Sequence, residues 1–388
     1  MRNLVDYLPR SDHRAIVEPD GAELSYDQLH EEVERIAGGL HAAGIGPGDR
    51  VVLLVPMGIE LYCSLLALFH LGAAAVLVDP SGPIEANLAH ARPSALIGVS
   101  RAHLLRLKTP ALRGLGTYIS TGFTLLPHRR LSSLSGSPPA LASPDELALI
   151  TFTTGTTGQP KCMGRSHHRL IAQHEALRCH MDLSPDDVDM PTLPVFLLHS
   201  LACGATCVIP DADLRHPVSI EPERVVAQMR REQVSTSSGS PAFYARLIDY
   251  LTETGAQVPS LQRIFLGGAR VPAPLLRDLH RCFPRAQLSV VYGSTEAEPI
   301  AVLDATKHLD TLGESERQGR GILVGQPVPA AQVRIVANEI CVAGPHVNPG
   351  YLDDPDATSR TKTPEVLRDG TTRIWHRTGD AGYQDDDG

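Results

Sequence analysis

The sequence predicts an α/β protein with two parallel-sheet α/β subdomains and a small β-rich subdomain. Two observations predict this class. Apolar, strand-like segments alternate with helix-like segments over most of the chain, and after Gly321 the pattern changes to short β-rich pieces separated by Gly, Pro and Asn. Such alternation is typical of a parallel sheet covered by helices. At 388 residues, the chain exceeds the size at which a single core usually divides. We expect subdomains over residues 1–145, 146–300 and 301–388.

The first predicted helix begins at a capping box, in which Ser25 is followed by Gln28. Apolar residues then recur at helical spacing until Gly44, which predicts an amphipathic helix that ends there. Strand-like, helix-like and strand-like segments follow at residues 51–55, 61–71 and 74–78. The Ser- and Pro-rich stretch 131–144 is typical of a surface connection between subdomains.

A second alternating region is predicted from Leu147 to about Pro299. It opens with residues 147–152, an apolar run with the composition of a buried strand. In the last region, strands are expected at residues 332–336, 339–342 and 373–376.

A loop rich in Thr and Gly follows the strand predicted at 147–152, and it has the composition of a phosphate-binding loop. Glycine lets the backbone approach an anion closely, while hydroxyls and backbone N–H groups donate to phosphate oxygens. Lys161 adds a positive charge at the end of this loop. The spacing differs from that of the Walker loop, and a solvent-exposed loop without a ligand explains this segment as well. The loop residues are Thr153, Thr154, Gly155, Thr156, Thr157, Gly158, Gln159, Pro160 and Lys161.

The composition limits the partners of the chain. With 35 Lys and Arg against 44 Asp and Glu, the net charge of −9 argues against a nucleic-acid or anionic membrane surface, although a local basic cleft for a nucleotide is allowed. We expect small molecules or proteins as partners. No apolar run reaches the roughly 18 residues of a membrane span, and the N-terminus lacks a signal-peptide core, so we expect a cytoplasmic protein.

The seven cysteines lack a regular framework, which favours reduced thiols. Cys203 and Cys207 have a spacing that suggests a metal site, but no His or Cys partner lies at a convincing distance in the sequence. We therefore expect no metal–cysteine site. The histidines are scattered, and we expect them to be surface or core residues.

Five blocks, in this order, resemble those of the AMP-forming adenylating superfamily, which includes acyl-CoA synthetases, luciferases and the adenylation domains of peptide synthetases. Cys162 replaces the glycine that ends the family's phosphate loop. The blocks are residues 153–161, Gly267-Gly268-Ala269, Tyr292-Gly293-Ser294-Thr295-Glu296, Gly344-Pro345 with Gly350-Tyr351-Leu352, and Arg377-Thr378-Gly379-Asp380.

The resemblance implies an ATP-dependent reaction in which a carboxylate displaces pyrophosphate and forms an acyl-AMP anhydride. It implies that Thr153 and Lys161 act on the phosphates, that Thr295 contacts the α-phosphate and that Glu296 binds Mg²⁺. It further implies that Tyr292 lies beside adenine and that Asp380 accepts hydrogen bonds from the ribose. The implied ATP or AMP contacts are Thr154, Gly155, Thr156, Thr157, Gly158, Gly267, Gly268, Ala269, Tyr292, Gly293, Ser294 and Asp380. Taken singly, each residue also has a structural explanation in the core, at a strand end or in a turn.

The acyl pocket is predicted from a block that lacks the Asp with which amino-acid-activating relatives bind the substrate ammonium. We therefore expect a fatty or otherwise apolar acid without an α-amino group. A core strand explains the same apolar residues equally well. The predicted pocket residues are Phe196, Leu197, Leu198, His199, Gly239 and Ser240.

A finer resemblance links several segments to the β-lactone synthetase subgroup of bacterial olefin synthesis. They are residues 190–194, 208–213, 239–242, 316–321 and 324–329. It implies that a 3-hydroxyl group closes the acyl adenylate to a lactone. The second step that we expect first is transfer of the acyl group to CoA, or to the thiol of an acyl or peptidyl carrier protein that bears phosphopantetheine, and closure of the lactone is the alternative. A non-catalytic nucleotide- or acyl-binding module is a third.

The superfamily also has a hinge and a small C-terminal domain with a lysine used in adenylate formation, and the chain stops at Gly388, before both. We expect the chain to be a portion of a longer protein that was prepared for expression, rather than a natural fragment. We also expect it to bind ATP or AMP but to turn over weakly.

Overall fold

The computed structural model describes residues 3–79, 82–154, 160–386 and 388. The chain divides into two units, and each is described by itself. Unit 1 comprises Met1–Asp12, Leu24–Ala172 and Asn348–Pro364, and unit 2 comprises His13–Glu23, Gln173–Val347 and Glu365–Gly388.

The core of unit 1 is a seven-stranded sheet with the strand order β7-β6-β5-β3-β4-β8-β9. Neighbouring strands run parallel, except that β8 and β9 form an antiparallel pair. The strands span Arg50–Leu54 (β3), Ala74–Leu77 (β4), Ala95–Gly98 (β5), Thr117–Ser120 (β6), Arg129–Arg130 (β7), Leu147–Thr154 (β8) and Pro160–Ser166 (β9).

The helices that connect and cover these strands include the two that the sequence predicts, α1 and α2. The α-helices span Tyr26–Ala42 (α1), Ile59–Leu71 (α2), Ile84–Ala91 (α3), Ser100–Leu104 (α4), His167–Arg178 (α5) and Pro355–Thr361 (α11). The residues of α5 from Gln173 on belong to unit 2. Short 3₁₀ helices span Leu4–Tyr7 (η1), Leu105–Leu107 (η2), Pro110–Leu112 (η3) and Leu131–Ser133 (η4).

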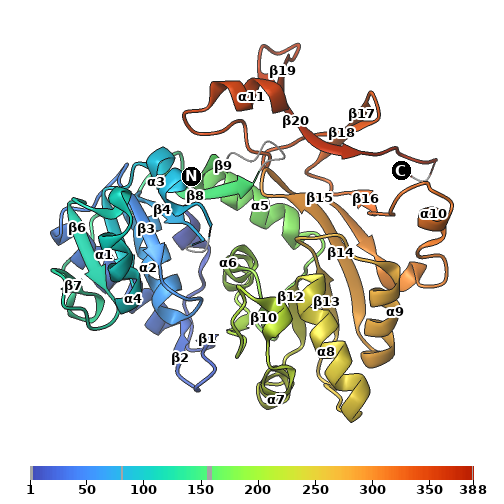
Figure 1. Cartoon of the computed structure of the whole chain (residues 1–388), viewed down its shortest axis with the longest axis horizontal. Helices are drawn as coiled ribbons and strands as arrows, with labels where there is room; N and C mark the ends of the chain where they lie inside the picture. Colours follow the sequence, from blue (N-terminus) through green and yellow to red (C-terminus); the bar gives the residue numbers. More distant parts are fainter. Residues whose placement is uncertain (1–2, 80–81, 155–159, 387) are drawn as a thin grey trace. The chain divides into compact units, whose positions relative to one another are not determined.

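The capping box predicted at Ser25 is confirmed. The backbone N–H of Gln28 donates to Ser25 Oγ at 3.2 Å, and the backbone N–H of Ser25 donates to Gln28 Oε1 at 2.9 Å. These bonds satisfy two donors at the start of α1 that the helix itself leaves unpaired. The apolar face predicted along α1 is buried and packs against α2 (Figure 1).

Unit 2 contains a nine-stranded sheet with the order β16-β15-β14-β13-β12-β10-β11-β1-β2. The strands from β1 to β14 in this order run parallel, whereas β14, β15 and β16 pair antiparallel. The strands span Arg14–Val17 (β1), Glu23–Ser25 (β2), Val188–Pro191 (β10), Thr206–Val208 (β11), Thr236–Gly239 (β12), Arg263–Leu266 (β13), Gln287–Ser294 (β14), Ala297–Asp304 (β15) and Gln326–Pro327 (β16).

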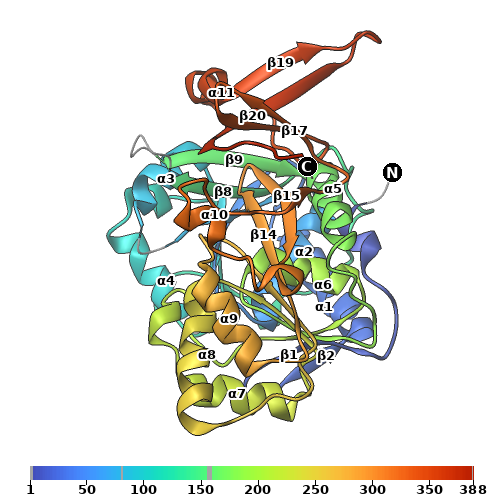
Figure 2. The same cartoon turned by 90° about the vertical axis from the view of Figure 1, so that its right-hand side faces the viewer.

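Three helices of unit 2 pack against this sheet through one apolar cluster, to which α7 contributes Met229, α8 Leu247 and α9 Leu279 (Figure 2). Burial of such side chains is the dominant favourable term in folding. The helices of the unit span Pro194–Ala202 (α6), Pro217–Ser219 (η5), Pro222–Arg231 (α7), Pro241–Thr254 (α8), Ala273–Cys282 (α9), Ala305–His308 (η6) and Glu314–Arg317 (α10).

A smaller four-stranded sheet has the order β17-β18-β20-β19, and its β17-β18-β20 part is antiparallel. Its strands span Gln332–Val336 (β17), Glu339–Ala343 (β18), Lys362–Val366 (β19) and Thr372–Ala381 (β20). This sheet is the β-rich subdomain that the sequence predicts after Gly321. The fold class is therefore confirmed, with antiparallel strands ending each of the two larger sheets.

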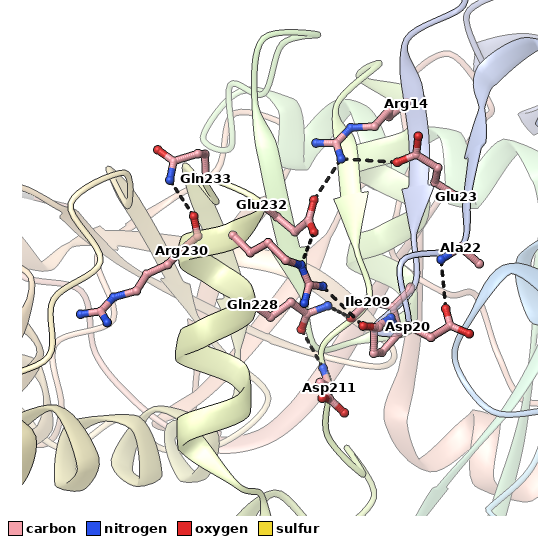
Figure 3. Close-up of polar contacts among 12 residues, drawn as sticks. Arg14, Asp20, Ala22, Glu23, Ile209, Asp211, Gln228, Arg230, Glu232 and Gln233 are labelled. Carbon is pink, nitrogen blue, oxygen red and sulfur yellow. Dashed lines mark hydrogen bonds and ion pairs between the residues drawn. The ribbon is translucent and has the colours of Figure 1, made fainter.

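A polar network ties the N-terminal strand β1 to the helix α7 (Figure 3). Arg14 Nη1 lies 2.9 Å from Glu232 Oε2, just after α7, and 3.5 Å from Glu23 Oε2. Nearby, Gln228 Nε2 donates to the carbonyl oxygen of Ile209 at 2.8 Å, and the backbone N–H of Asp211 donates to Gln228 Oε1. The Arg14 contacts and the pairing of β1 with β11 hold residues 13–23 in the nine-stranded sheet, although the rest of the N-terminal region belongs to unit 1.

The sheets divide the chain differently from the consecutive ranges that we expected. Strand β8, expected to open the second subdomain, pairs with β4 in the first sheet through Ala75–Leu149 and Val76–Ile150. The stretch 131–144 leads to β8 and so connects two parts of unit 1, with Leu131 and Leu134 buried. Strand pairing with distant segments, which composition does not reveal, decides this membership.

Two glycines of α1 pack closely against the stretch 131–144. A Cβ atom on Gly38 would lie 2.0 Å from the carbonyl oxygen of Gly136, and one on Gly39 would lie 2.4 Å from Leu134 Cβ. Helical glycine is normally unfavourable by about 1 kcal/mol relative to alanine. Here the missing side chains are what let the segment pack on the helix.

We predict that Gly38→Ala destabilises the protein by about 1–3 kcal/mol, because backbone atoms cannot yield to the added methyl group. The free energy of unfolding in urea measures this. Gly46→Ala is the matched control, since nothing lies within 4 Å of a Cβ at Gly46. Equal stability of the two variants would contradict the close packing of α1.

Candidate functional site

The predicted phosphate loop connects β8 and β9 in unit 1. Thr153 pairs with Lys161 at the end of this hairpin. Lys161 Nζ lies 5.1 Å from the centre of the Tyr351 ring, a cation–π distance that holds the lysine head group beside the hairpin. Gly155, Thr156, Thr157, Gly158 and Gln159 lie outside the described residues, and for Thr154 only the backbone pairing with Pro160 is described.

Cys162, which stands where the related loops have glycine, is a core residue. Its side chain is 1% exposed and packs in the apolar cluster of unit 1. Burial raises the pKa of the Cys162 thiol to about 11, so the thiol is neutral at pH 7. Its carbonyl oxygen accepts a hydrogen bond from the backbone N–H of Leu352 at 2.8 Å. The substitution therefore changes packing beneath the hairpin rather than adding a charge.

In unit 2, three predicted segments meet at the carboxyl ends of parallel strands. Gly239 ends β12, Gly267 follows β13, and the backbone N–H of Gly267 donates to the carbonyl oxygen of Gly239 at 3.1 Å. A Cβ on Gly267 would lie 3.2 Å from the carbonyl oxygen of Val291, the residue before Tyr292 in β14. Parallel sheets commonly bind ligands at this edge.

The next block turns tightly between β14 and β15. A Cβ on Gly293 would lie 2.8 Å from the carbonyl oxygen of Ala297, so glycine permits this close approach. Among the described residues, the buried Ser294 hydroxyl has no protein hydrogen-bond partner. Thr295 is exposed and Glu296 is half-buried, both in the turn. Orphaned polar atoms of this kind often await a ligand, and the Glu296 carboxylate is of the type that Mg²⁺ prefers.

Tyr292 and Asp380 contact each other, although they are far apart in sequence. The Tyr292 hydroxyl donates to Asp380 Oδ2 at 2.7 Å. Burial and the neighbouring Asp380 carboxylate raise the pKa of Tyr292, so its hydroxyl keeps its proton at neutral pH. The bond leaves Asp380 exposed. The residues expected at adenine and at ribose therefore lie side by side in unit 2.

The predicted acyl-pocket block is the helix α6, so the alternative of a core strand is wrong. Pro194 starts the helix, where its fixed φ and missing N–H are tolerated. Phe196 and Leu197 are buried, while Leu198 is half-buried. At the start of the block, Leu193 Cδ1 would lie 3.8 Å from a Cβ on Gly268, and Thr192 Oγ1 would lie 2.8 Å from one on Gly239. The start of α6 thus reaches the edge formed by β12 and β13, where Ser240 caps α8.

His199, 2% exposed, uses both ring nitrogens for protein contacts. Its Nδ1 lies 3.0 Å from Nδ1 of His174 on α5, and its Nε2 lies 3.4 Å from the carbonyl oxygen of Met181 and 3.7 Å from Cys203 Sγ. Burial lowers the pKa of His199 to about 3, so the ring is neutral. His174, His199 and Cys203 have ligand atoms within 4.8 Å of one another. The contacts lie on different sides of the His199 ring, which fits a hydrogen-bonded core cluster.

Asp189 on β10 is fully buried below α6. Its Oδ2 lies 2.6 Å from Ser200 Oγ, and its Oδ1 lies 2.7 Å from Thr236 Oγ1. The Ser200 hydroxyl also lies 3.0 Å from the carbonyl oxygen of Phe196 and has one proton to donate. A protonated Asp189 would satisfy both contacts, and burial indeed raises the pKa of Asp189. This carboxyl group fixes α6 to the sheet.

A comparison with known families decides the classification, since residues 8–352 match the model described as AMP-binding enzyme. The chain belongs to the AMP-binding enzyme family. An olefin beta-lactone synthetase of Stenotrophomonas maltophilia (strain K279a) is 34% identical over 94% of this chain and 71% of that protein. A feruloyl-CoA synthase of Amycolatopsis sp. is 30% identical over 97% of this chain and 74% of that protein.

The fold of this AMP-binding enzyme is also that of solved relatives. A long-chain-fatty-acid-CoA ligase of Archaeoglobus fulgidus superposes with a TM-score of 0.83 at 20% identity, over 99% of this chain and 82% of that one. The family match and the curated relatives, rather than this structural likeness, make the chain an AMP-forming ligase by family. None of the described helices combines the length and apolar character that crossing a membrane requires.

Three polar residues near α6 escaped the sequence analysis of this AMP-binding enzyme: His174, Asp189 and Ser200. Asp189 carried a usable signal, because a lone carboxylate inside the apolar strand Val188–Pro191 must be paired or neutral when buried. His174 carried none, because nothing in its sequence surroundings relates it to His199.

We predict that Asp189→Asn becomes more stable relative to the parent protein as pH rises. The raised pKa means that folding opposes ionisation of Asp189, so the parent protein loses stability above the unfolded pKa of about 4, by at most about 1.4 kcal/mol per pH unit. Asparagine does not ionise and has the same shape. Unfolding in urea between pH 5 and pH 8, roughly, measures the difference. The exposed Asp249→Asn is the control, and a flat or opposite slope for Asp189→Asn would contradict the neutral carboxyl.

We predict that Tyr292→Phe weakens AMP binding by roughly 10-fold, because a hydrogen bond to a charged acceptor contributes about 1.5 kcal/mol and Asp380 would lose its orientation. Isothermal titration of the 388-residue chain with AMP measures this. Tyr250→Phe on α8 removes a hydroxyl elsewhere and should leave the affinity unchanged. Unchanged affinity in Tyr292→Phe would remove the Tyr292–Asp380 pair from the nucleotide site.

Proposed function

We propose that this AMP-binding enzyme activates an apolar carboxylic acid that lacks an α-amino group. A carboxylate oxygen attacks the α-phosphorus of ATP, the bond to the bridging oxygen breaks, and pyrophosphate leaves. The composition of α6 is the observation that supports this substrate class. The helix contains no acidic residue, and the Asp189 carboxyl group beneath it is buried and bonded to Ser200 and Thr236. A substrate ammonium group would therefore find no counter-ion there.

The nucleotide would be held by backbone and side chains at the ends of β13 and β14 and by Asp380. In this proposal Tyr292 lies along adenine, Asp380 accepts from the ribose hydroxyls, and the exposed Thr295 donates to the α-phosphate. Gly267, Gly268 and Ala269 leave room for the purine, and Gly293 and Ser294 shape the turn beside it. Donors placed in advance stabilise charge that grows in the transition state.

The phosphates would be held by the β8–β9 loop. We propose that Thr153, Thr154, Gly155, Thr156, Thr157, Gly158 and Lys161 bind the β- and γ-phosphates, as the family resemblance implies. Glu296 would hold Mg²⁺, which when bound neutralises charge on the phosphate oxygens.

For the second step we propose closure of a β-lactone. The 3-hydroxyl oxygen of the acyl group attacks the acyl carbon, the bond to AMP breaks, and the hydroxyl proton leaves to solvent. The 34% identity with an olefin beta-lactone synthetase, over 94% of the chain, favours this outcome.

The second candidate is transfer of the acyl group to a thiol, of CoA or of a carrier protein. The 30% identity with a feruloyl-CoA synthase favours it. Both candidates share the first step, so they differ only in the nucleophile that reaches the acyl carbon.

We predict that Glu296→Gln lowers pyrophosphate release by at least about 100-fold, because the variant keeps the shape of the side chain but loses the charge that binds Mg²⁺. Coupled detection of pyrophosphate measures it, and the exposed Glu253→Gln on α8 serves as control. Unchanged release in Glu296→Gln would exclude the metal assignment.

A panel of acids separates the candidate functions. Release on 3-hydroxy fatty acids without a thiol, together with a lactone mass, supports the proposed second step. Release that yields a thioester with CoA or a carrier supports the ligase. Binding of AMP with no release on fatty, 3-hydroxy-fatty or aryl acids would instead favour a non-catalytic nucleotide- or acyl-binding module.

A further inference from the structure

One stretch of unit 1 carries positive charges and no acidic residue. Residues 86–144 contain seven Lys and Arg and no Asp or Glu, although the whole chain carries −9. Arg92 lies 3.2 Å from Asp353, which leaves six cations. Among the described residues, no ion pair involves any of those six, which are Arg101, Arg106, Lys108, Arg113, Arg129 and Arg130.

Large apolar side chains are exposed in the same stretch. Leu125 is 91% exposed and Phe123 66%, both in the loop between β6 and β7, while Leu104 and Leu107 are 57% and 59% exposed at the ends of α4 and η2. These are four of the eleven large apolar residues found exposed in the described part of the chain. Exposed apolar groups that gather together usually mark an interaction site.

Printed contacts show that these segments are neighbours. The Arg106 guanidinium lies 3.4 Å from the centre of the Tyr118 ring, and its Nη1 donates to the carbonyl oxygen of Pro127 at 3.0 Å. The His103 and His128 rings lie 6.2 Å apart. Thus α4 and η2 lie beside the loop that carries Phe123 and Leu125.

Two further cations border this loop. Arg129 and Arg130 form β7, which ends the seven-stranded sheet and pairs with β6 through Ile119 and Ser120. Arg113 Nε donates to the carbonyl oxygen of Arg106 at 3.1 Å. We call the six cations and four exposed apolar residues the basic-apolar surface; α4, β6 and β7 mark its place in Figure 1.

We infer that the basic-apolar surface docks unit 1 on an anionic lipid surface. Cations would lie at the phosphate level, and the side chains of Phe123 and Leu125 would enter the boundary between head groups and acyl chains. Stable attachment to a bilayer commonly needs two such signals together, one electrostatic and one apolar. This is attachment to a surface, which requires no membrane-spanning helix.

The observations favour lipid over an acidic protein or a nucleic acid. Leu125 projects from a loop almost fully exposed, which suits insertion between lipids, where no complementary pocket is needed. Protein interfaces instead bury a packed core in which the two surfaces are complementary in shape. A nucleic-acid surface uses cations but gains little from exposed leucines.

Co-sedimentation of the 388-residue chain with vesicles tests the inference. We expect binding to vesicles of equal parts phosphatidylcholine and phosphatidylglycerol, little binding to pure phosphatidylcholine, and weakening by salt. Removing two cations in Arg129→Gln/Arg130→Gln should lower the partition coefficient roughly 30-fold, at about 1 kcal/mol per cation. Leu125→Ser should lower it several-fold.

Two matched variants serve as controls. Arg360→Gln/Arg368→Gln removes the same charge from exposed residues outside the stretch, and Val366→Ser removes an apolar side chain that is 75% exposed. Both should bind as the parent protein does, and thermal unfolding should confirm that every variant is folded.

Several results would overturn the inference. The first is absence of binding to anionic vesicles at low salt. The cations of β7 would then be explained as charges that protect an edge strand from aggregation. Equal losses in the control variants would show that only total charge matters. Binding to heparin or an acidic protein that persists in Leu125→Ser, without vesicle binding, would assign the surface to a polyanion instead.

Discussion

Parallel strand pairing is the constraint on which the rest of unit 2 depends. Because parallel neighbours require crossover connections, the carboxyl ends of β10, β12, β13 and β14 share one edge of the sheet. The register fixes how close their loops come, since Gly239 pairs with Leu266, and Leu266 with Val290. Segments far apart in sequence are thereby placed within hydrogen-bonding distance. Glycines at this edge then let backbones approach where side chains would collide.

The fold class was predictable because its signals are local. The capping box at Ser25, the apolar spacing of α1 and the change to short strands after Gly321 all depend on neighbouring residues, and the structure confirms them. Sheet membership was not predictable, because β8 joins the first sheet and residues 13–23 join the second through pairing with distant strands. The helical state of the α6 block was not predicted, since a core strand was the structural alternative considered there and this short, mostly apolar segment carries no decisive period.

For the candidate site, sequence blocks identified the residues but not their partners. Tyr292 and Asp380 were each assigned a separate nucleotide contact, whereas the structure joins them by a hydrogen bond at 2.7 Å. Two groups outside α6, the His174 ring and the buried Asp189 carboxyl group, bond to the helix residues His199 and Ser200. Removing one partner of such a group leaves the other buried and unsatisfied, which costs more than the bond contributes. The apolar block therefore depends on polar groups that its own sequence does not contain.

Charge segregation in unit 1 has a practical consequence. Since the whole chain carries −9 and residues 86–144 carry +7, the other residues together carry −16. The net charge of the whole chain therefore describes neither residues 86–144 nor the remaining residues. A chromatographic resin samples local patches rather than the average, because screening limits each contact to about 10 Å in ordinary buffers. Such a protein should be retained on both cation- and anion-exchange media near neutral pH, and its elution would report on the orientation in which each resin holds it.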